Sequence, residues 1–379
     1  LSITTTGTTT GETDDGIYAF NFSGTDLTIN AAETTGNDDG IIADNYGSGA
    51  LSITTTGKTT GGDDGIDADN FGTDLTINAV TTTGKRDGIF AQNYGSGALS
   101  ITTTGNTTGT DYDGIYAYNS SESTGDLTII TAETSGGIAA EVLGDDYGIQ
   151  AYNYGSGALS ITTTGMTTGT KGDGIYANNS SNSTGDLTIV AAKTSGGDDG
   201  IQAINYGSGT LSITTSSMIT GGDDYGISTH TSTNQTAFVT LNSGAAVRST
   251  AGLGIYNNKG NSVITVNTGA SIAGEIVLNE GADSLEFAGS DFSTVTLFDG
   301  GSDSLGLIEP IELSKISISV AENSDTLKFS NSSGSLNGDK VTNWEAVEIN
   351  DGSTISFSNN SLTADMLSIN TGGTLNMLS

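Results

Sequence analysis

The chain contains 379 residues, with 44 Asp plus Glu against 10 Lys plus Arg and a formal net charge of −34. Because so acidic a chain repels phosphate backbones and anionic lipid headgroups, we expect no nucleic-acid partner and no direct binding to a membrane surface. The absence of Cys excludes disulfides and thiolate metal sites, and 56 Gly without a Gly-X-Y period exclude collagen.

The first 235 residues form an array of short repeats. One segment, Leu-[Ser/Thr]-Ile, alternates apolar and polar residues as a half-buried strand does. A second segment, Thr-[Thr/Ser]-Gly, follows it, and an Asp-rich turn leads to a third segment, Gly-Ile-x-Ala-x-Asn. The third segment begins at Gly16, Gly40, Gly65, Gly88, Gly114, Gly148, Gly174 and Gly200. Three short strands therefore recur about every 24 residues.

A unit of this length cannot bury its own apolar face, so neighbouring units must stack. We therefore predict an all-β, right-handed parallel β-helix (a solenoid) with one rung for each repeat of about 24 residues. The side chains of Ile17, Ala19 and Leu27 should point inward. The Asn residues that end the third segment, from Asn21 to Asn205, should stack into a column in which amides bond from rung to rung.

Two parts of the chain depart from the repeat. The insertion at 137–146, with Ile138, Val142 and Leu143, is predicted to be a protruding loop, where recognition often resides. We divide the chain into a regular array, 1–235, and a degenerate C-terminal capping region, 236–379. Because Leu1 lies in mid-repeat, we expect a fragment whose targeting segment has been removed.

The C-terminal region contains four segments that resemble one family. They are Ala270-Ser-Ile-Ala-Gly-Glu-Ile-Val-Leu278, Ala282-Asp-Ser-Leu285, Phe298-Asp-Gly-Gly-Ser-Asp-Ser-Leu305 and Val341-Thr-Asn-Trp-Glu-Ala-Val-Glu-Ile-Asn-Asp-Gly-Ser-Thr354. With these segments, residues 270–379 resemble the passenger domain of bacterial autotransporters (type V secretion). The resemblance implies a secreted β-helix held at the outer membrane by a C-terminal barrel that is absent here. The family includes adhesins, self-aggregating proteins, proteases and lipases, so the resemblance alone does not choose a function.

Asp recurs in the turn before the third segment. Stacking of the rungs would place Asp15, Asp39, Asp64, Asp87 and Asp113 in one anionic column. Ca²⁺ could bridge carboxylate oxygens in such a column. The other interpretation is that Asp forms the turn and adds solubility. We expect no other metal and no cofactor.

Aromatic residues recur at two positions of the repeat. Tyr18, Phe90, Tyr116 and Tyr176 follow the Ile of the third segment and should point outward, where they could stack on sugar rings or pack against another copy of the chain. A second set follows the Asn and contains Tyr46, Phe71, Tyr94, Tyr154 and Tyr206. For the second set we favour a corner column that shields the core.

The distribution of ionisable residues argues against an enzyme. Glycoside cleavage requires a unique cluster of acids in a groove, whereas the acids here repeat along the array. The only His is His230, which we interpret as a surface residue rather than part of a Ser-His-Asp triad. We predict an adhesin or self-aggregation rod at the bacterial cell surface, binding other copies of itself, or glycans or proteins of a cell surface, through many weak contacts. The alternative is a carbohydrate-active β-helix enzyme.

Overall fold

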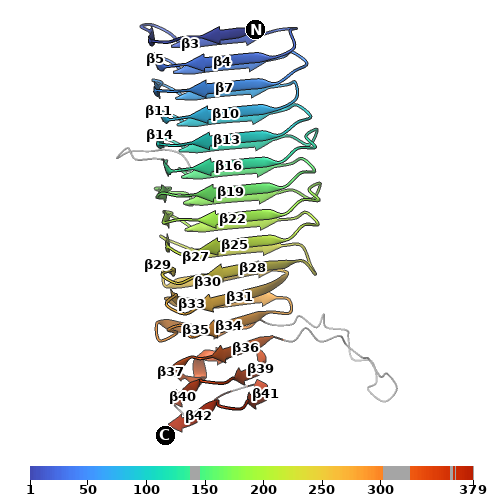
Figure 1. Ribbon diagram of the computed structural model, residues 1–379. Coiled ribbons are helices and arrows are strands. Elements are labelled where there is room, and N and C mark those ends of the chain that lie inside the picture. The colour runs from blue at the N-terminus through green and yellow to red at the C-terminus, as the bar shows by residue number, and fades with distance from the viewer. Residues whose placement is uncertain (137–145, 302–324, 359–361, 363, 379) are drawn as a thin grey trace, which may run out of the picture.

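The computed structural model describes residues 1–136, 146–301, 325–358, 362 and 364–378. The chain winds into a solenoid whose two ends lie far apart, with the rungs stacked between them (Figure 1). Neighbouring strands within each sheet pair in parallel. The predicted parallel β-helix is therefore confirmed. No helix in the described part of the chain has the length and apolar character that crossing a membrane would require.

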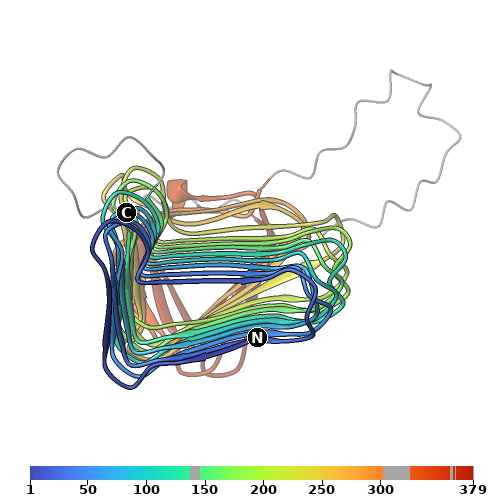
Figure 2. The same cartoon turned by 90° about the horizontal axis from the view of Figure 1, so that it is seen from above.

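Three sheets run along the solenoid, and they form two long sides and one short side in cross-section (Figure 2). Sheet A has 15 strands: β1 (Ser2–Thr4), β4 (Leu27–Ala31), β7 (Leu51–Thr55), β10 (Leu75–Ala79), β13 (Leu99–Thr103), β16 (Leu127–Thr131), β19 (Leu159–Thr163), β22 (Leu187–Ala191), β25 (Leu211–Thr215), β28 (Thr236–Leu241), β31 (Asn261–Asn267), β34 (Ser284–Ala288), β36 (Thr326–Ser330), β39 (Trp344–Ile349) and β41 (Ala364–Ile369). Sheet B, on the short side, has 11 strands: β2 (Thr8–Gly11), β5 (Glu33–Gly36), β8 (Lys58–Thr60), β11 (Thr81–Gly84), β14 (Asn106–Gly109), β17 (Glu133–Ser135), β20 (Thr167–Thr168), β23 (Thr194–Ser195), β26 (Met218–Gly221), β29 (Ala246–Ser249) and β32 (Ser271–Ile272).

Sheet C has 13 strands and is built largely from the third segment of the repeat. Its strands are β3 (Ile17–Asn21), β6 (Ile41–Asn45), β9 (Ile66–Asn70), β12 (Ile89–Asn93), β15 (Ile115–Asn119), β18 (Ile149–Asn153), β21 (Ile175–Asn179), β24 (Ile201–Asn205), β27 (Tyr225–Thr231), β30 (Leu253–Lys259), β33 (Gly274–Glu280), β35 (Val295–Asp299) and β38 (Val341–Thr342). A short sheet D at the C-terminal end contains β37 (Ser333–Asn337), β40 (Thr354–Ser358) and β42 (Thr374–Leu378), and a 3₁₀ turn, η1, spans Gly338–Lys340.

The core is a set of aliphatic columns. Leu75 pairs with Leu99 in sheet A, and Ile89 pairs with Ile115 in sheet C, so each apolar residue lies on its equivalent in the next rung. All four side chains are fully buried. A shift of one residue would turn every one of them outward, so the period-2 pattern fixes the register.

A column of glycines allows sheets B and C to approach closely. A Cβ added at Gly88 would lie 2.6 Å from the carbonyl oxygen of Gly114 and 2.8 Å from Cγ2 of Thr107. Such contacts are too short for any real Cβ, so this position excludes a side chain unless the backbone moves. The same geometry recurs at Gly40, Gly65 and Gly114, which explains why glycine precedes the Ile in each repeat.

The Asn residues that end the strands of sheet C form a hydrogen-bonded ladder, as predicted. Nδ2 of Asn45 donates to Oδ1 of Asn70 at 2.8 Å, and Nδ2 of Asn70 donates to Oδ1 of Asn93 at 2.8 Å. The ladder runs from Asn21 to Asn205, and its members from Asn45 onward are almost fully buried. Each amide also donates to a carbonyl of its own turn, as Asn45 does to Gly49 at 3.0 Å. The ladder therefore fixes both the turn and the spacing of the rungs.

The C-terminal rungs are filled by larger side chains. Phe287, Phe292, Phe298 and Phe329 are buried and lie within 5.0 to 5.9 Å of one another in successive ring pairs. Nε1 of the buried Trp344 donates to the carbonyl of Phe298 at 3.0 Å. Phe287 and Phe329 continue the sheet A column that holds Ala or Thr in the regular array, and Phe298 continues the Ile column of sheet C.

Candidate recognition face

The outward side of sheet C differs from the rest of the solenoid. In each Ile-x-Ala-x-Asn strand the first, third and fifth side chains are buried, and the second and fourth point outward. We call these outward residues the sheet C face. On sheet A the equivalent second position from β4 to β25 is always Ser or Thr. On the sheet C face the residue changes from rung to rung, so chemical variety is concentrated there.

The register brings only some of the predicted aromatic residues together. Phe90 and Tyr116 are neighbours, with ring centroids 4.9 Å apart and planes inclined by 12°. Tyr18 is 60% exposed and is separated from Phe90 by two rungs, which carry Ile42 and Asp67 at this position.

Tyr152 joins the predicted residues in the following rungs. It occupies the fourth position of β18 and lies 6.1 Å from Tyr116 and 5.4 Å from Tyr176. Tyr118, at the fourth position of β15, lies 5.7 Å from Tyr94. The sequence interpretation considered the second position alone and missed both. The alternation of the strand identifies the fourth position as outward too.

The second aromatic set forms a stacked column beside the face. Ring centroids are 4.5 Å apart for Tyr46 and Phe71 and 4.8 Å apart for Phe71 and Tyr94, with nearly parallel planes. Tyr118 then links Tyr94 to Tyr154. Each such pair contributes about 0.5 to 1.5 kcal/mol beyond its buried area. Tyr152 and Tyr154, with ring centroids 6.2 Å apart, join this column to Tyr116 and Tyr176, so most of the two predicted sets form one aromatic ladder. Tyr18 lies outside this ladder, and Tyr206 packs against His230 instead.

The inclination between rings divides this ladder into two parts. From Tyr46 to Tyr94 the planes differ by only 10° and 11°, so each ring covers the face of its neighbour. Around Tyr152 the ring of Tyr154, 6.2 Å away, is inclined by only 17°, whereas the rings of Tyr116 and Tyr176 are inclined by 52°. Rings inclined in this way do not cover one another's faces. Tyr46, Phe71 and Tyr154 are 40 to 48% exposed, whereas Tyr116, Tyr152 and Tyr176 are partly buried, so both parts of the ladder present ring surface to solvent.

The Asp column along the edge of sheet C has a structural role. The backbone N–H of Asp39 donates to Oδ1 of Asp15 at 3.1 Å, and that of Asp64 donates to Oδ1 of Asp39 at 2.6 Å. The same bond recurs at Asp87 and Asp113. The side chains from Asp39 to Asp113 in this column are buried. These bonds join each Asp to the backbone of the next rung rather than closing its own turn, and neither these bonds nor the burial were predicted from the sequence.

Burial changes the protonation of the column. It is the main cause that raises the pKa of Asp39 to about 6 and the pKa of Asp199 to about 7. Burial, reinforced by the charge of Asp199, raises the pKa of Asp173 to about 8. Part of the column therefore keeps its protons near neutral pH, so it carries less charge than the number of Asp residues suggests.

Among the described residues, two groups of carboxylates are close enough to share a cation. Within each group the oxygens lie within 4.8 Å of one another, and the groups are Asp14, Asp15 and Asp38, and Asp39, Asp63 and Asp64. Asp14 and Asp15, with Tyr18, also line an open depression of about 320 Å³. Binding of Ca²⁺ to the predicted residues Asp15, Asp39, Asp64, Asp87 and Asp113 stays a prediction.

Arg86 supplies positive charge to part of the same column. Its guanidinium lies 2.5 Å from Asp64, 3.5 Å from Asp63 and 3.4 Å from Asp87. It also lies 5.4 Å from the ring centroid of Phe90. Oδ1 of Asp64 accepts a backbone N–H and Oδ2 contacts Arg86, so both oxygens already have partners. A cation at this rung would have to displace the guanidinium.

Three further acids stand on the sheet C face itself. Asp44 lies on β6, and Asp67 and Asp69 lie on β9. Burial is the main cause that raises the pKa of Asp67 to about 7 and that of Asp69 to about 6. These acids do not belong to the repeated turn, and the sequence interpretation did not single them out. They occupy outward positions that hold no acid in the strands from β12 to β24.

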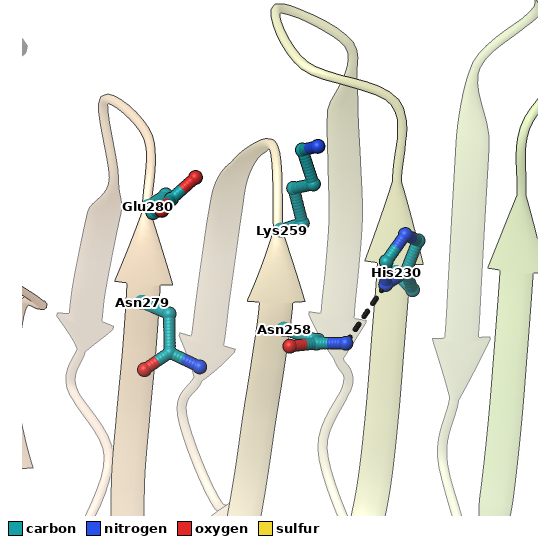
Figure 3. Close-up of a pocket in the computed structure, with 5 residues that line it drawn as sticks. All are labelled: His230, Asn258, Lys259, Asn279 and Glu280. Atoms are coloured by element: carbon teal, nitrogen blue, oxygen red, sulfur yellow. Dashed lines mark hydrogen bonds between the residues drawn. The ribbon is translucent and has the colours of Figure 1, made fainter. Parts of the chain in front are cut away.

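An open depression of about 470 Å³ lies at the C-terminal part of the same face (Figure 3). It is lined by His230, Asn258, Lys259, Asn279 and Glu280. Asn258 and His230 lie on neighbouring strands, with Nδ2 of Asn258 2.9 Å from Nδ1 of His230 (Figure 3). Burial lowers the pKa of His230, with a smaller effect from Lys259. No Ser or Asp lines the depression among the described residues, so it does not hold a Ser-His-Asp triad.

The predicted recognition residues Ile138, Val142 and Leu143 lie outside the described residues. Comparisons with models of protein families, with curated proteins and with solved structures give no match to this chain. The candidate site is therefore argued from its own geometry: an aromatic ladder, a set of uncharged polar side chains beside it, and an acidic group at one end.

Proposed function

We propose that this chain is the surface-exposed part of an autotransporter-like protein and acts as an adhesin or self-aggregation rod. The observation that supports the proposal best is the sheet C face, where aromatic rings repeat over several rungs. Aromatic residues are enriched at recognition sites because they bury large areas at little entropic cost. A rod with many moderate contacts binds a repetitive surface by avidity, without one deep pocket.

The proposal is tested by displaying the chain on cells that neither attach nor clump. We expect clumping or attachment with the native chain, and its loss in the triple variant Tyr116→Ser, Tyr118→Ser and Tyr152→Ser. The matched control, Ser100→Ala, Thr102→Ala and Ser160→Ala, changes outward residues of sheet A in nearby rungs and should keep the phenotype. Circular dichroism establishes that both variants fold. Equal adhesion of the native chain and the tyrosine variant would contradict the proposal.

The alternative, a carbohydrate-active enzyme, is favoured by one specific observation. Asp44, Asp67 and Asp69 form the only acidic group at outward positions of the Ile-x-Ala-x-Asn strands, and the raised pKa of Asp67 suits a general acid. Arg86 and Phe90 lie close by. Under this alternative, release of reducing ends from a polysaccharide would be lost in Asp67→Asn. Under our proposal, neither the native chain nor the variant releases any product.

A further inference from the structure

The part of the sheet C face between β12 and β24 is free of formal charge. Its ten outward side chains are five aromatic rings, four carboxamides and one isoleucine: Phe90, Gln92, Tyr116, Tyr118, Gln150, Tyr152, Tyr176, Asn178, Gln202 and Ile204. Each of the five consecutive rungs therefore presents at least one ring or carboxamide. Rings can pack on the C–H faces of a sugar, and a carboxamide can both donate to and accept from hydroxyl groups.

Several of these polar groups are already held in place. Nε2 of Gln202 donates to Oδ2 of Asp199 at 3.0 Å, and the hydroxyl of Tyr94 donates to Oε1 of Gln92 at 2.5 Å. Nδ2 of Asn178 donates to the hydroxyl of Tyr176 at 3.2 Å. Each bond uses one of the groups on the amide and leaves the other for a ligand. A surface that is ordered in advance loses less entropy on binding.

The spacing of the face suits a linear polymer. Rungs are about 4.8 Å apart, close to the length that one hexose adds to an extended chain. The second and fourth positions of a strand are about 7 Å apart, so they form two columns that a single chain can bridge. A polymer that lies along the solenoid axis would therefore meet a ring or an amide at each sugar.

The negative net charge of the protein favours uncharged polymers over anionic ones. With a formal net charge of −34, the chain repels both an anionic polysaccharide and a second copy of itself, so of the two roles proposed above the charge favours adhesion over self-aggregation. The ten outward side chains include no cation, and Arg86, which lies beside Phe90, is already paired with Asp63, Asp64 and Asp87. We infer that the sheet C face from Phe90 to Gln202 binds an uncharged linear glycan that runs parallel to the solenoid axis. This inference rests on the proposed role in adhesion and specifies its ligand.

The inference is tested on the whole chain by affinity electrophoresis through gels that contain soluble glucans, mannans, xylans or galactans. Alginate serves as the anionic probe. We expect at least one neutral polymer to retard the native chain, with an affinity that changes less than twofold when the salt concentration is raised tenfold, since no ion pairs form. Alginate should not retard it.

Two variants locate the site. Tyr152→Ala should weaken retardation at least tenfold, and Gln150→Ala, which removes a half-exposed side chain with little risk to folding, should weaken it measurably. Thr162→Ala, on the outward side of sheet A in the next rung, should have no effect. Retardation by no neutral polymer, retardation by alginate, or equal retardation of all three variants would overturn the inference. If displayed cells still adhere while no neutral glycan binds, the ligand class alone is wrong; if they do not adhere, the proposed function fails as well.

Discussion

Replacing Asn93 by alanine is expected to lower the free energy of unfolding by about 3 to 5 kcal/mol, because it removes four hydrogen bonds inside the solenoid. Oδ1 of Asn93 accepts from Asn70 and from the backbone of Gly95, and Nδ2 donates to Gly97 and Asn119. Asn93 is fully buried, so water cannot replace the lost partners. Several polar groups would then be left buried without a hydrogen bond.

A matched control separates this effect from the general cost of losing an Asn. Asn78 is an exposed residue of β10, and Asn78→Ala should change stability by no more than about 0.5 kcal/mol. Urea unfolding measures the free energy of unfolding of both variants. Amide hydrogen exchange near β12 detects opening that is confined to a few rungs, since repeat arrays can unfold in parts. A loss of stability in Asn93→Ala no larger than that in Asn78→Ala would contradict a structural role for the ladder.

The rung architecture could be predicted from the sequence because the two-residue alternation within each strand and the repeat of the whole rung indicate the same fold. The alternation of Leu75 and Ile77 with polar residues assigns one face of each strand to the core. The repeat of about 24 residues then places equivalent residues in adjacent rungs. The Asn ladder followed from the same reasoning, since a buried amide that recurs at one position of a rung finds its partner in the next copy. Each of these features depends on the repeat alone.

The chemistry of the surface could be predicted only in part, because it depends on residues that break the repeat. Tyr118 and Tyr152 come from rungs whose fourth position differs from that of their neighbours, so the repeat gives no reason to group them. The ring inclinations depend on packing between rungs of unequal length. The motif predicted that Asp39 lies in a turn, but its burial depends on how closely the next rung approaches.

Replacing Asp173 by asparagine is expected to remove part of an unusual pH dependence. Asp173 is 2% exposed, and burial raises its pKa to about 8, whereas the unfolded chain has an ordinary Asp. Between these two pKa values the folded state binds more protons than the unfolded state, so stability falls as pH rises. The native chain should therefore lose about 2 to 4 kcal/mol of unfolding free energy between pH 5 and pH 8 through this residue.

Asp173→Asn can keep the hydrogen bond that joins this position to the next rung. The backbone N–H of Asp199 donates to Oδ1 of Asp173 at 2.9 Å, and the amide oxygen of Asp173→Asn can accept the same bond without a charge. The variant should match the native chain at pH 5, be more stable at pH 8, and show a flatter profile in urea unfolding. Asp186→Asn is the control, because the exposed Asp186 accepts an equivalent backbone bond from Thr210 at 2.8 Å. If Asp173→Asn were less stable than the native chain at pH 8, the buried carboxylate would have to be charged and stabilised by a partner such as a bound cation, and the column would need to be reinterpreted as a metal site.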